Sequence, residues 1–195
     1  EDKKTEYLVP QDFNDAKEEK VEAKNSSAYI KGYEDGSFKP NGKVTRAEAS
    51  VMIARLQNGS DDFKNSGETK LADANNEWIP KEVAFVSEKG LINGYEDGSF
   101  KPNANITRAE FAKIIAVSAK NDAINKSPFK DINGHWAEAY IDNVFTTGFI
   151  KGYEDNTFKP DNEITRAEAV TILNATFNVK ENADRESGER ILGTH

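Results

Sequence analysis

Apolar residues recur three or four positions apart in several stretches, and polar segments rich in turn-forming residues separate them. Residues 136–149 show this spacing clearly and residues 78–91 less regularly, which predicts two amphipathic helices. Glycines 90 and 148 follow, as expected just past a helix end. Three more apolar runs, over residues 51–56, 114–117 and 170–177, predict further helices. The pattern therefore predicts a mainly α fold.

The same tetrapeptide, Thr-Arg-Ala-Glu, precedes each of these last three runs. Threonine is a favoured N-cap, and a glutamate three positions later completes a capping box, in which each side chain accepts a hydrogen bond from the other residue's backbone amide. We therefore expect helices to begin at these tetrapeptides. The capping pairs would be Thr45 with Glu48, Thr107 with Glu110, and Thr165 with Glu168.

The tetrapeptide closes a longer block that occurs three times. The copies cover residues 32–48, 94–110 and 152–168, at spacings of 62 residues (32 to 94) and 58 residues (94 to 152). Such a period indicates an array of one small unit. Units of about 60 residues are too small for robust cores of their own, so we expect them to share one.

Each full repeat is predicted to form helix–loop–helix. The loop is built around an Asp-Gly or Asp-Asn pair, which favours a tight turn. Tyr33 and Phe38 flank the first of these turns, and their counterparts flank the others, so the aromatic rings could hold a short hairpin-like loop on the core. A proline at 40, 102 and 160 ends the extended part.

The first copy departs from the pattern. Its opening helix would run over residues 16–27, which are mostly charged and small, and no tryptophan precedes it. We expect this helix to be short or frayed. The predicted organisation is a first repeat at 1–56, a linker at 57–70, a second repeat at 71–120, a linker at 121–128, a third repeat at 129–178 and a polar tail at 179–195.

Composition and charge exclude several function classes. The 195 residues have a formal net charge of −8, which argues against nucleic acid as the main partner. The absence of cysteine excludes disulfides and thiolate metal sites. No apolar run is long enough to span a bilayer. No signal peptide is visible either, which leaves a cytoplasmic chain or a trimmed, exported segment. Motifs of nucleophilic, zinc or phosphate chemistry are also missing, so we predict a non-enzymatic protein without a metal or cofactor.

The arginine of each tetrapeptide is a candidate binding residue. Arg46, Arg108 and Arg166 fall at the first helical position, where the helix dipole disfavours a cation. Helix formation alone does not require arginine there, but an arginine beside free N-terminal amides suits an anion. The alternatives are a salt bridge to an acid such as Asp73 or Asp131, or inheritance by duplication.

Other repeated side chains have two interpretations each. Trp78 and Trp136 could pack in the core or stack on a sugar at the edge of a groove. Asp73 and Asp131 could cap a helix or bind a ligand hydroxyl. A lysine before each loop proline could be a solvated charge or a ligand contact, at Lys39, Lys101 and Lys159. The loop acids lack the ligand order of a calcium-binding EF-hand.

These motifs resemble the S-layer homology (SLH) repeat. The third copy is the clearest, with Phe-Lys-Asp at 129–131, His-Trp-Ala at 135–137, Gly-Phe-Ile-Lys-Gly at 148–152 and Ile-Thr-Arg-Ala-Glu at 164–168. The second copy is nearly as good, and the resemblance covers residues 13–178. It implies three repeats in a pseudo-threefold arrangement around a shared central helical bundle.

The resemblance also implies a function outside the cell, at the cell wall or S-layer. SLH repeats anchor surface proteins without a covalent bond, by holding secondary cell-wall polysaccharide in grooves between repeats, often through pyruvylated N-acetylmannosamine. On this basis the three arginines would contact the carboxylate, and the tryptophans, aspartates and lysines named above would line the grooves. Because the first repeat lacks the tryptophan, fewer than three grooves should be fully competent.

Two alternatives remain from the sequence. The repeats could be a protein–protein assembly module of an S-layer lattice that binds other subunits. They could also be a non-catalytic segment of a larger surface enzyme. If the arginines read an anion, replacing Arg108 or Arg166 by alanine should weaken glycan binding with little loss of fold, because helix capping depends on the threonine and the glutamate.

Overall fold

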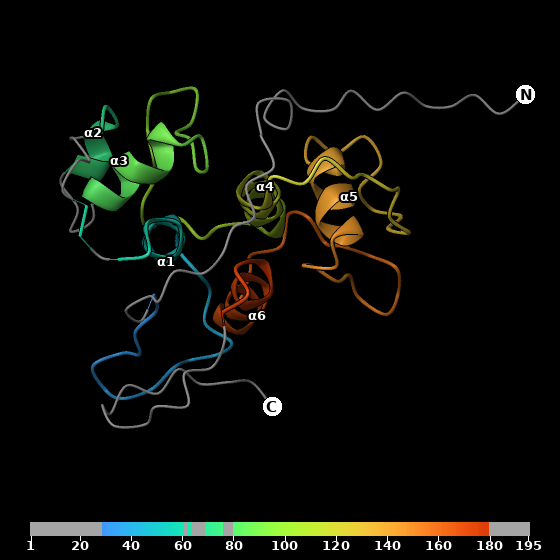
Figure 1. The fold of residues 1–195 in the computed structure, drawn as a ribbon, viewed down its shortest axis with the longest axis horizontal. Helices are drawn as coiled ribbons and strands as arrows, with labels where there is room; N and C mark the ends of the chain where they lie inside the picture. Colours follow the sequence, from blue (N-terminus) through green and yellow to red (C-terminus); the bar gives the residue numbers. More distant parts are fainter. Residues whose placement is uncertain (1–28, 61, 64–68, 76–79, 180–195) are drawn as a thin grey trace, which may run out of the picture. The chain divides into compact units, whose positions relative to one another are not determined.

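The computed structural model describes residues 29–60, 62–63, 69–75 and 80–179 (Figure 1). Extended segments within these residues pair only through two isolated bridges. The expectation of a mainly α fold is confirmed. The helices of the described residues are α1 (Arg46–Asn58), α2 (Ala72–Asn75), α3 (Pro80–Glu88), α4 (Arg108–Ala119), α5 (Glu138–Thr146) and α6 (Arg166–Thr176).

Helices α1, α4 and α6 begin at the arginine of each tetrapeptide, as predicted. In all three, the threonine hydroxyl accepts a hydrogen bond from the glutamate N–H at 3.1–3.2 Å. The glutamate carboxylate accepts one from the threonine N–H at 2.8–2.9 Å. The three capping boxes are therefore confirmed.

The first helices of the second and third repeats are α3 and α5, and both end where the glycines predict. Gly90 and Gly148 adopt the left-handed conformation, with φ of 66° and 74°. The expected frayed helix of the first repeat lies outside the described residues. Helix α1 extends to Asn58, so the first two residues of the expected linker at 57–70 belong to this helix.

The expected hairpins are tight turns without strands. In the first copy, the N–H of Tyr33 bonds the Ser37 carbonyl at 2.9 Å and the N–H of Gly36 bonds the Tyr33 carbonyl at 2.9 Å. A carboxylate then closes the turn, because Asp35 accepts from the Ser37 amide and hydroxyl. These side-chain bonds take the place of the backbone hydrogen bonds between two strands that a hairpin would need. The loop therefore forms no strand within the described residues.

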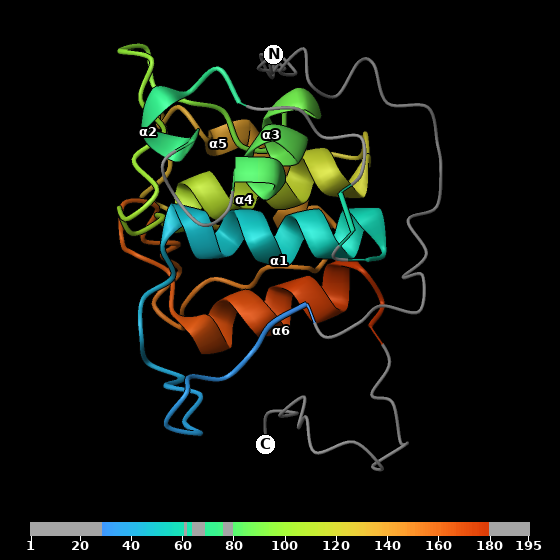
Figure 2. The same cartoon turned by 90° about the vertical axis from the view of Figure 1, so that its left-hand side faces the viewer.

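The chain divides into two compact units. Unit 1 contains residues 107–162, with α4 packed against α5. Unit 2 contains the described residues from 29 to 106 and from 163 to 179. In this unit α1 packs against α3, and α2 and α6 also belong to it. Within unit 2, α1 and α6 run roughly parallel (Figure 2).

Three equivalent residues form a cyclic set of backbone hydrogen bonds inside unit 2. Val44, Ile106 and Ile164 each precede an N-cap threonine, and none is more than 1% exposed. The N–H of Val44 bonds the Ile164 carbonyl at 3.2 Å, that of Ile106 bonds the Val44 carbonyl at 2.9 Å, and that of Ile164 bonds the Ile106 carbonyl at 3.1 Å. The three residues that precede the N-cap threonines are therefore linked in a closed cycle of hydrogen bonds.

In the second and third copies, the glycine that opens the loop motif makes room for the first residue of the repeat. A Cβ on Gly94 would lie 2.6 Å from a methyl carbon of Leu71. A Cβ on Gly152 would overlap the ring of Phe129. Leu71 opens the Leu-Ala-Asp motif at 71–73, and Phe129 opens the Phe-Lys-Asp motif at 129–131. Each motif lies against the loop motif of its own repeat, which is possible because glycine lacks a side chain.

In unit 1, the expected linker at 121–128 is bound to α5. The carboxylate of Asp142 accepts from the Ser127 amide at 2.9 Å and from its hydroxyl at 2.6 Å. The amide group of Asn143 donates to the carbonyls of Asn121 and Ala123. Asp142 and Asn143 are fully buried, so this segment is an ordered edge of the unit.

Candidate functional site: three cation–tyrosine clusters

The three tetrapeptide arginines build the same cluster three times. Each guanidinium lies against a tyrosine and a phenylalanine from the loop of the next repeat, and the arginine of the third repeat contacts the loop of the first. The distances from the guanidinium carbon to the ring centroids are 4.6–5.0 Å. We call these sets cluster A (Arg46, Tyr95, Phe100, Lys101), cluster B (Arg108, Tyr153, Phe158, Lys159) and cluster C (Arg166, Tyr33, Phe38, Lys39).

Each arginine also holds its partner loop by hydrogen bonds. In cluster A, Nε of Arg46 donates to the Phe100 carbonyl at 2.8 Å and Nη2 donates to the Asn93 carbonyl at 2.7 Å. The equivalent bonds of Arg108 and Arg166 are 2.8–3.4 Å long. The arginines are only 3–4% exposed. Each therefore joins its own repeat to another one, a role that sequence reasoning missed because the accepting carbonyls are distant in the sequence.

The N-terminal amides of these helices are not free. The N–H groups of Arg46 and Ala47 donate to the carbonyls of Ala104 and Pro102, both at 2.9 Å. The first two N–H groups of α4 and α6 donate to loop carbonyls in the same way, and the third N–H of each helix donates to the hydroxyl of its N-cap threonine. The sequence-based premise that these helix amides are free is wrong, because loop carbonyls already satisfy these donors.

The loop lysine of each cluster lies over the same tyrosine. The Nζ atoms of Lys39, Lys101 and Lys159 are 4.0, 4.3 and 4.1 Å from their ring centroids. Their φ angles are 52–55°, a left-handed conformation that costs a residue other than glycine roughly 1–2 kcal/mol. The same strained geometry in three copies shows that the fold imposes the position of the ammonium group.

Acidic side chains balance part of this charge. Asp35 pairs with Lys39 at 3.6 Å, and Asp97 pairs with Lys101 at 3.8 Å, all largely exposed. Hydrogen bonds from the Ser99 hydroxyl and amide hold the pKa of Asp97 below its ordinary value, with a smaller contribution from Lys101. These carboxylates therefore stay charged near neutral pH, and Lys39 and Lys101 each keep a counter-ion with which a ligand carboxylate would have to compete.

Asp73 and Asp131 support the loops and do not contact the arginines. Asp73 accepts from the amides of Phe100 and Lys101, each at 2.8 Å. Asp131 accepts from the amides of Phe158 and Lys159, each at 2.8 Å. Asp131 forms neither the salt bridge nor the helix cap that the sequence suggested. The N-cap of α5 is Ala137, which makes no side-chain hydrogen bond. The two aspartates instead fix the backbone that carries the lysines.

Trp136 lies at the surface. Its side chain is 58% exposed, at the start of α5, and its ring centroid is 6.5 Å from that of Tyr140. The preceding residue, His135, lies 3.2 Å from a carboxylate oxygen of Asp161. This arrangement leaves the indole face available to a ligand, in line with the sugar-stacking alternative. Trp78 lies outside the described residues.

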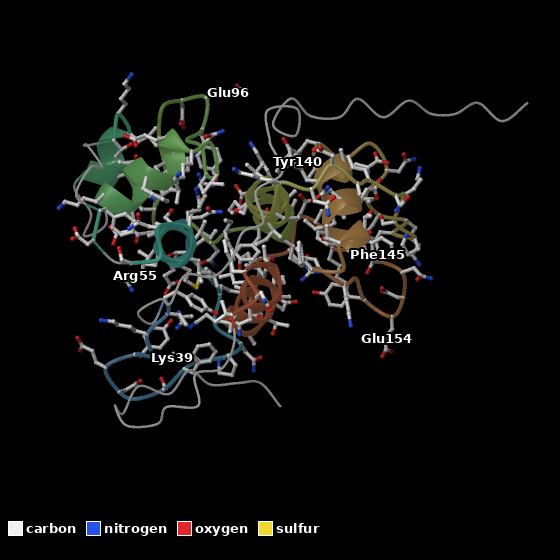
Figure 3. All side chains as sticks on the ribbon, in the orientation of Figure 1. Lys39, Arg55, Glu96, Tyr140, Phe145 and Glu154 are labelled. Carbon is white, nitrogen blue, oxygen red and sulfur yellow. The ribbon has the colours of Figure 1, made fainter. Side chains whose placement is uncertain are left out.

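Unit 2 contains a cavity of about 230 Å³ beside cluster C. It is lined by residues 29–33, by four residues of α1 including Glu48 and Arg55, and by Arg166. Figure 3 shows Arg55 on the side of α1 that faces the loop carrying Lys39. Arg166 donates to Glu48 across the cavity wall at 3.4 Å. Sequence reasoning did not select Arg55, although it breaks the repeat.

The described residues contain no group of three or more histidine, cysteine, aspartate or glutamate side chains that could hold a metal ion. None of their helices is both long and apolar enough to cross a membrane.

These features define a tandem-repeat binding module. Arginines that bind loops join its helical repeats, and similar clusters of aromatic and cationic side chains lie where the repeats are joined. The chain belongs to the S-layer homology domain family, whose model matches residues 14–50, 70–112 and 128–170. Three matched segments confirm the repeat assignment.

Relatives with this module occur at bacterial cell surfaces. The chain is 40% identical over 159 residues to a cellulosome-anchoring protein and 39% identical over 160 residues to cell surface glycoprotein 1, both of Acetivibrio thermocellus. It is 28% identical over 151 residues to an S-layer protein of Bacillus licheniformis. The matches cover 75–76% of this chain but 35%, 7% and 17% of the respective relatives, so the shared part is a module of longer proteins.

Family membership and these relatives together support a role in anchoring at the cell surface. They also indicate an extracellular location at the cell wall.

Proposed function

We propose that the chain holds its parent protein on the cell wall by binding secondary cell-wall polysaccharide at the three clusters. The observation that carries the proposal is the repeated pairing of a surface tyrosine face with two cations, one from each of two repeats. Tyr95 and Tyr153 are 37% and 36% exposed, so a sugar ring could stack on them. The lysine ammonium of each cluster would then meet an acidic substituent on the sugar.

The anionic substituent that fits best is the carboxylate of a pyruvate ketal. Each arginine is largely engaged with loop carbonyls, so we assign it a supporting role. It positions the tyrosine and lysine and adds positive charge beneath them. The loop lysines and Trp136 would make the direct contacts, and Asp73 and Asp131 would keep the lysines in place.

Repetition accounts for firm attachment without a covalent bond. Each cluster is small and semi-exposed, so its affinity for one sugar unit should be weak. A polysaccharide carries many such units, and a second contact on the same polymer is intramolecular. Three weak sites in one module would therefore hold the polymer far more strongly than one site.

Calorimetry with purified Gram-positive secondary cell-wall polysaccharide, before and after removal of its pyruvate, tests the proposal. We expect heat of binding only with the pyruvylated form, and weaker binding at higher salt because the charges are screened. Lys101→Gln and Lys159→Gln should weaken binding while leaving the circular dichroism spectrum unchanged. If folded protein binds neither form of the glycan from its own source, assembly with other surface subunits becomes the better explanation.

A further inference from the structure

Four asparagines of the chain are each followed by a glycine, at Asn41, Asn58, Asn93 and Asn133. In such a pair the backbone nitrogen of the glycine can attack the side-chain amide of the asparagine, because glycine has no side chain to obstruct the approach. The attack needs a glycine N–H that is not already donating a hydrogen bond and an asparagine side chain that can turn toward it. The surroundings of the four pairs therefore decide which asparagine reacts.

In three of the pairs the glycine N–H is engaged. Those of Gly42 and Gly59 donate to backbone carbonyls at 2.9 and 2.8 Å. That of Gly134 donates to a carboxylate oxygen of Glu138 at 2.8 Å. Each of these hydrogen bonds must open before the nitrogen can attack. The structure therefore protects the asparagines that precede these three glycines.

The fourth pair, Asn93 and Gly94, has no such protection. The N–H of Gly94 donates to no acceptor among the residues that the structure describes, and the side-chain amide of Asn93 makes no hydrogen bond with them either. Asn93 is exposed, so its side chain can turn toward Gly94 and water can reach it.

A guanidinium group acts on the same peptide bond. Nη2 of Arg46 donates to the Asn93 carbonyl at 2.7 Å. Resonance couples this carbonyl oxygen to the Gly94 nitrogen. A charged donor on the oxygen therefore withdraws electron density from the nitrogen and makes its N–H more acidic. Loss of that proton turns the amide nitrogen into a nucleophile, so the arginine of cluster A favours the attack.

We propose that Asn93 is a site of spontaneous deamidation within cluster A. The Gly94 nitrogen attacks Cγ of Asn93, a new N–Cγ bond forms and the Cγ–Nδ2 bond breaks. The proton given up by the Gly94 nitrogen leaves with the side-chain nitrogen as ammonia, and a cyclic imide remains. Water then opens the imide at either carbonyl. One opening gives aspartate, and the other gives isoaspartate, in which the main chain runs through Cβ and Cγ.

Both products place a carboxylate beside the cations of cluster A. In isoaspartate the former carbonyl of Asn93, whose oxygen Arg46 holds, itself becomes the carboxylate. The main chain also gains one carbon directly before Gly94, where a Cβ would already lie 2.6 Å from Leu71 and 3.0 Å from the Ser99 carbonyl. Isoaspartate should therefore displace the loop of cluster A. None of these steps depends on what the clusters bind, so the modification and the proposed function can fail separately.

The other two repeats supply matched controls. The residues equivalent to Asn93 are Lys31 and Lys151, whose carbonyls accept from the arginines of clusters C and B at 3.0 and 3.4 Å. Lysine has no side-chain carbonyl to attack, so Asn93→Lys should keep the fold and abolish the reaction. The N–H of Gly152 also has no acceptor among the described residues. Lys151→Asn should therefore create a second reactive pair in the third repeat.

The test is peptide mapping by mass spectrometry after the folded chain has been incubated in mildly alkaline buffer. A parallel sample is incubated in guanidinium chloride, where the four pairs lose their surroundings and should react at similar rates. In the folded chain we expect Asn93 to react about fivefold faster than the other three asparagines, because one hydrogen bond must open first at each of those. Incubation should also lower the urea midpoint of the parent more than that of Asn93→Lys.

Several outcomes would overturn the proposal. Equal rates at the four asparagines of the folded chain, or a faster reaction at one of the other three, would show that the glycine amides do not control the reaction. An Asn93 that reacts in denaturant but keeps its amide in the folded chain would show that the fold protects it. A Lys151→Asn variant that stays intact would contradict the role of the unbonded glycine amide. An unchanged urea midpoint of the converted parent would refute the displacement of the loop.

Discussion

Replacing Arg166 by alanine should destabilise the fold, in contrast to the expectation from sequence alone. Arg166 donates to the carbonyls of Phe38 and Lys31, both at 3.0 Å, and to Glu48 at 3.4 Å. Alanine removes all three side-chain bonds, so the loop of the first repeat keeps only the backbone bonds from the first two N–H groups of α6 to the Gly42 and Pro40 carbonyls. The helix itself should still start correctly, because Thr165 and Glu168 cap it.

The magnitude follows from what each acceptor loses. A carbonyl that loses its partner costs roughly 1–3 kcal/mol, and the lower end applies because Lys31 is exposed and Phe38 half-buried. The pair with Glu48 adds at most about 1 kcal/mol, since that carboxylate is partly exposed. The total is about 2–4 kcal/mol. For a urea m-value of about 2 kcal/mol/M, the unfolding midpoint should fall by about 1–2 M.

The assay is urea unfolding followed by far-ultraviolet circular dichroism, with Arg55→Ala as the matched control. Arg55 lines the same cavity, but its Nε has no partner in the described part of the chain. Its removal should change the free energy of unfolding by less than about 1 kcal/mol. Equal midpoints for Arg166→Ala and the parent would refute the idea that the arginine links the repeats, and would return it to a purely ligand-binding role.

Two more predictions concern stability. Thr107→Ala should lower the free energy of unfolding by about 1 kcal/mol because it removes the N-cap of α4, whereas Thr171→Ala, in the exposed interior of α6, should have almost no effect in the same urea assay. Burial raises the pKa of Asp73, but the amides of Lys101 and Phe100 outweigh it, so the folded-state pKa lies below the ordinary 3.8. The ionised carboxylate of Asp73 therefore stabilises the fold fully above pH 3.8 and loses this effect as the pH falls further. The difference in free energy of unfolding between the parent and Asp73→Asn, measured by urea midpoints across this range, should narrow below pH 3.8. A gap that is constant with pH would contradict this assignment.

Local features of the fold could be predicted from the sequence. A capping box involves residues three positions apart, so Thr45 and Glu48 reveal their roles without knowledge of the tertiary structure. The glycines after α3 and α5 are equally local, since a left-handed residue just past a helix end favours glycine. The helical repeats were predictable for these reasons.

The site was less predictable, because its contacts join distant residues. Arg46 reaches a carbonyl 54 residues away, and Asp73 accepts from an amide 27 residues away. For the arginine, the sequence suggested an anion at the helix N-terminus, a salt bridge to an acid or inheritance by duplication, so the hydrogen bonds to carbonyls of another repeat were missed. Arg55 left one sequence signal: aligned copies show a charged residue where the others have Val117 and Ala175. Its position in the wall of the cavity became apparent only from the structure.

The hydrogen-bonded triangle of Val44, Ile106 and Ile164 has a consequence for the timing of export. Two of its sides involve Ile164, and the bond from Arg166 to Phe38 spans 128 residues. A chain that emerges N-terminus first cannot close this triangle until the third repeat has appeared, and closing so long a loop is slow. The order of the repeats thus delays closure of the triangle until nearly all of the module has passed through a secretion channel. The module then completes its fold on the side of the membrane that carries the cell wall.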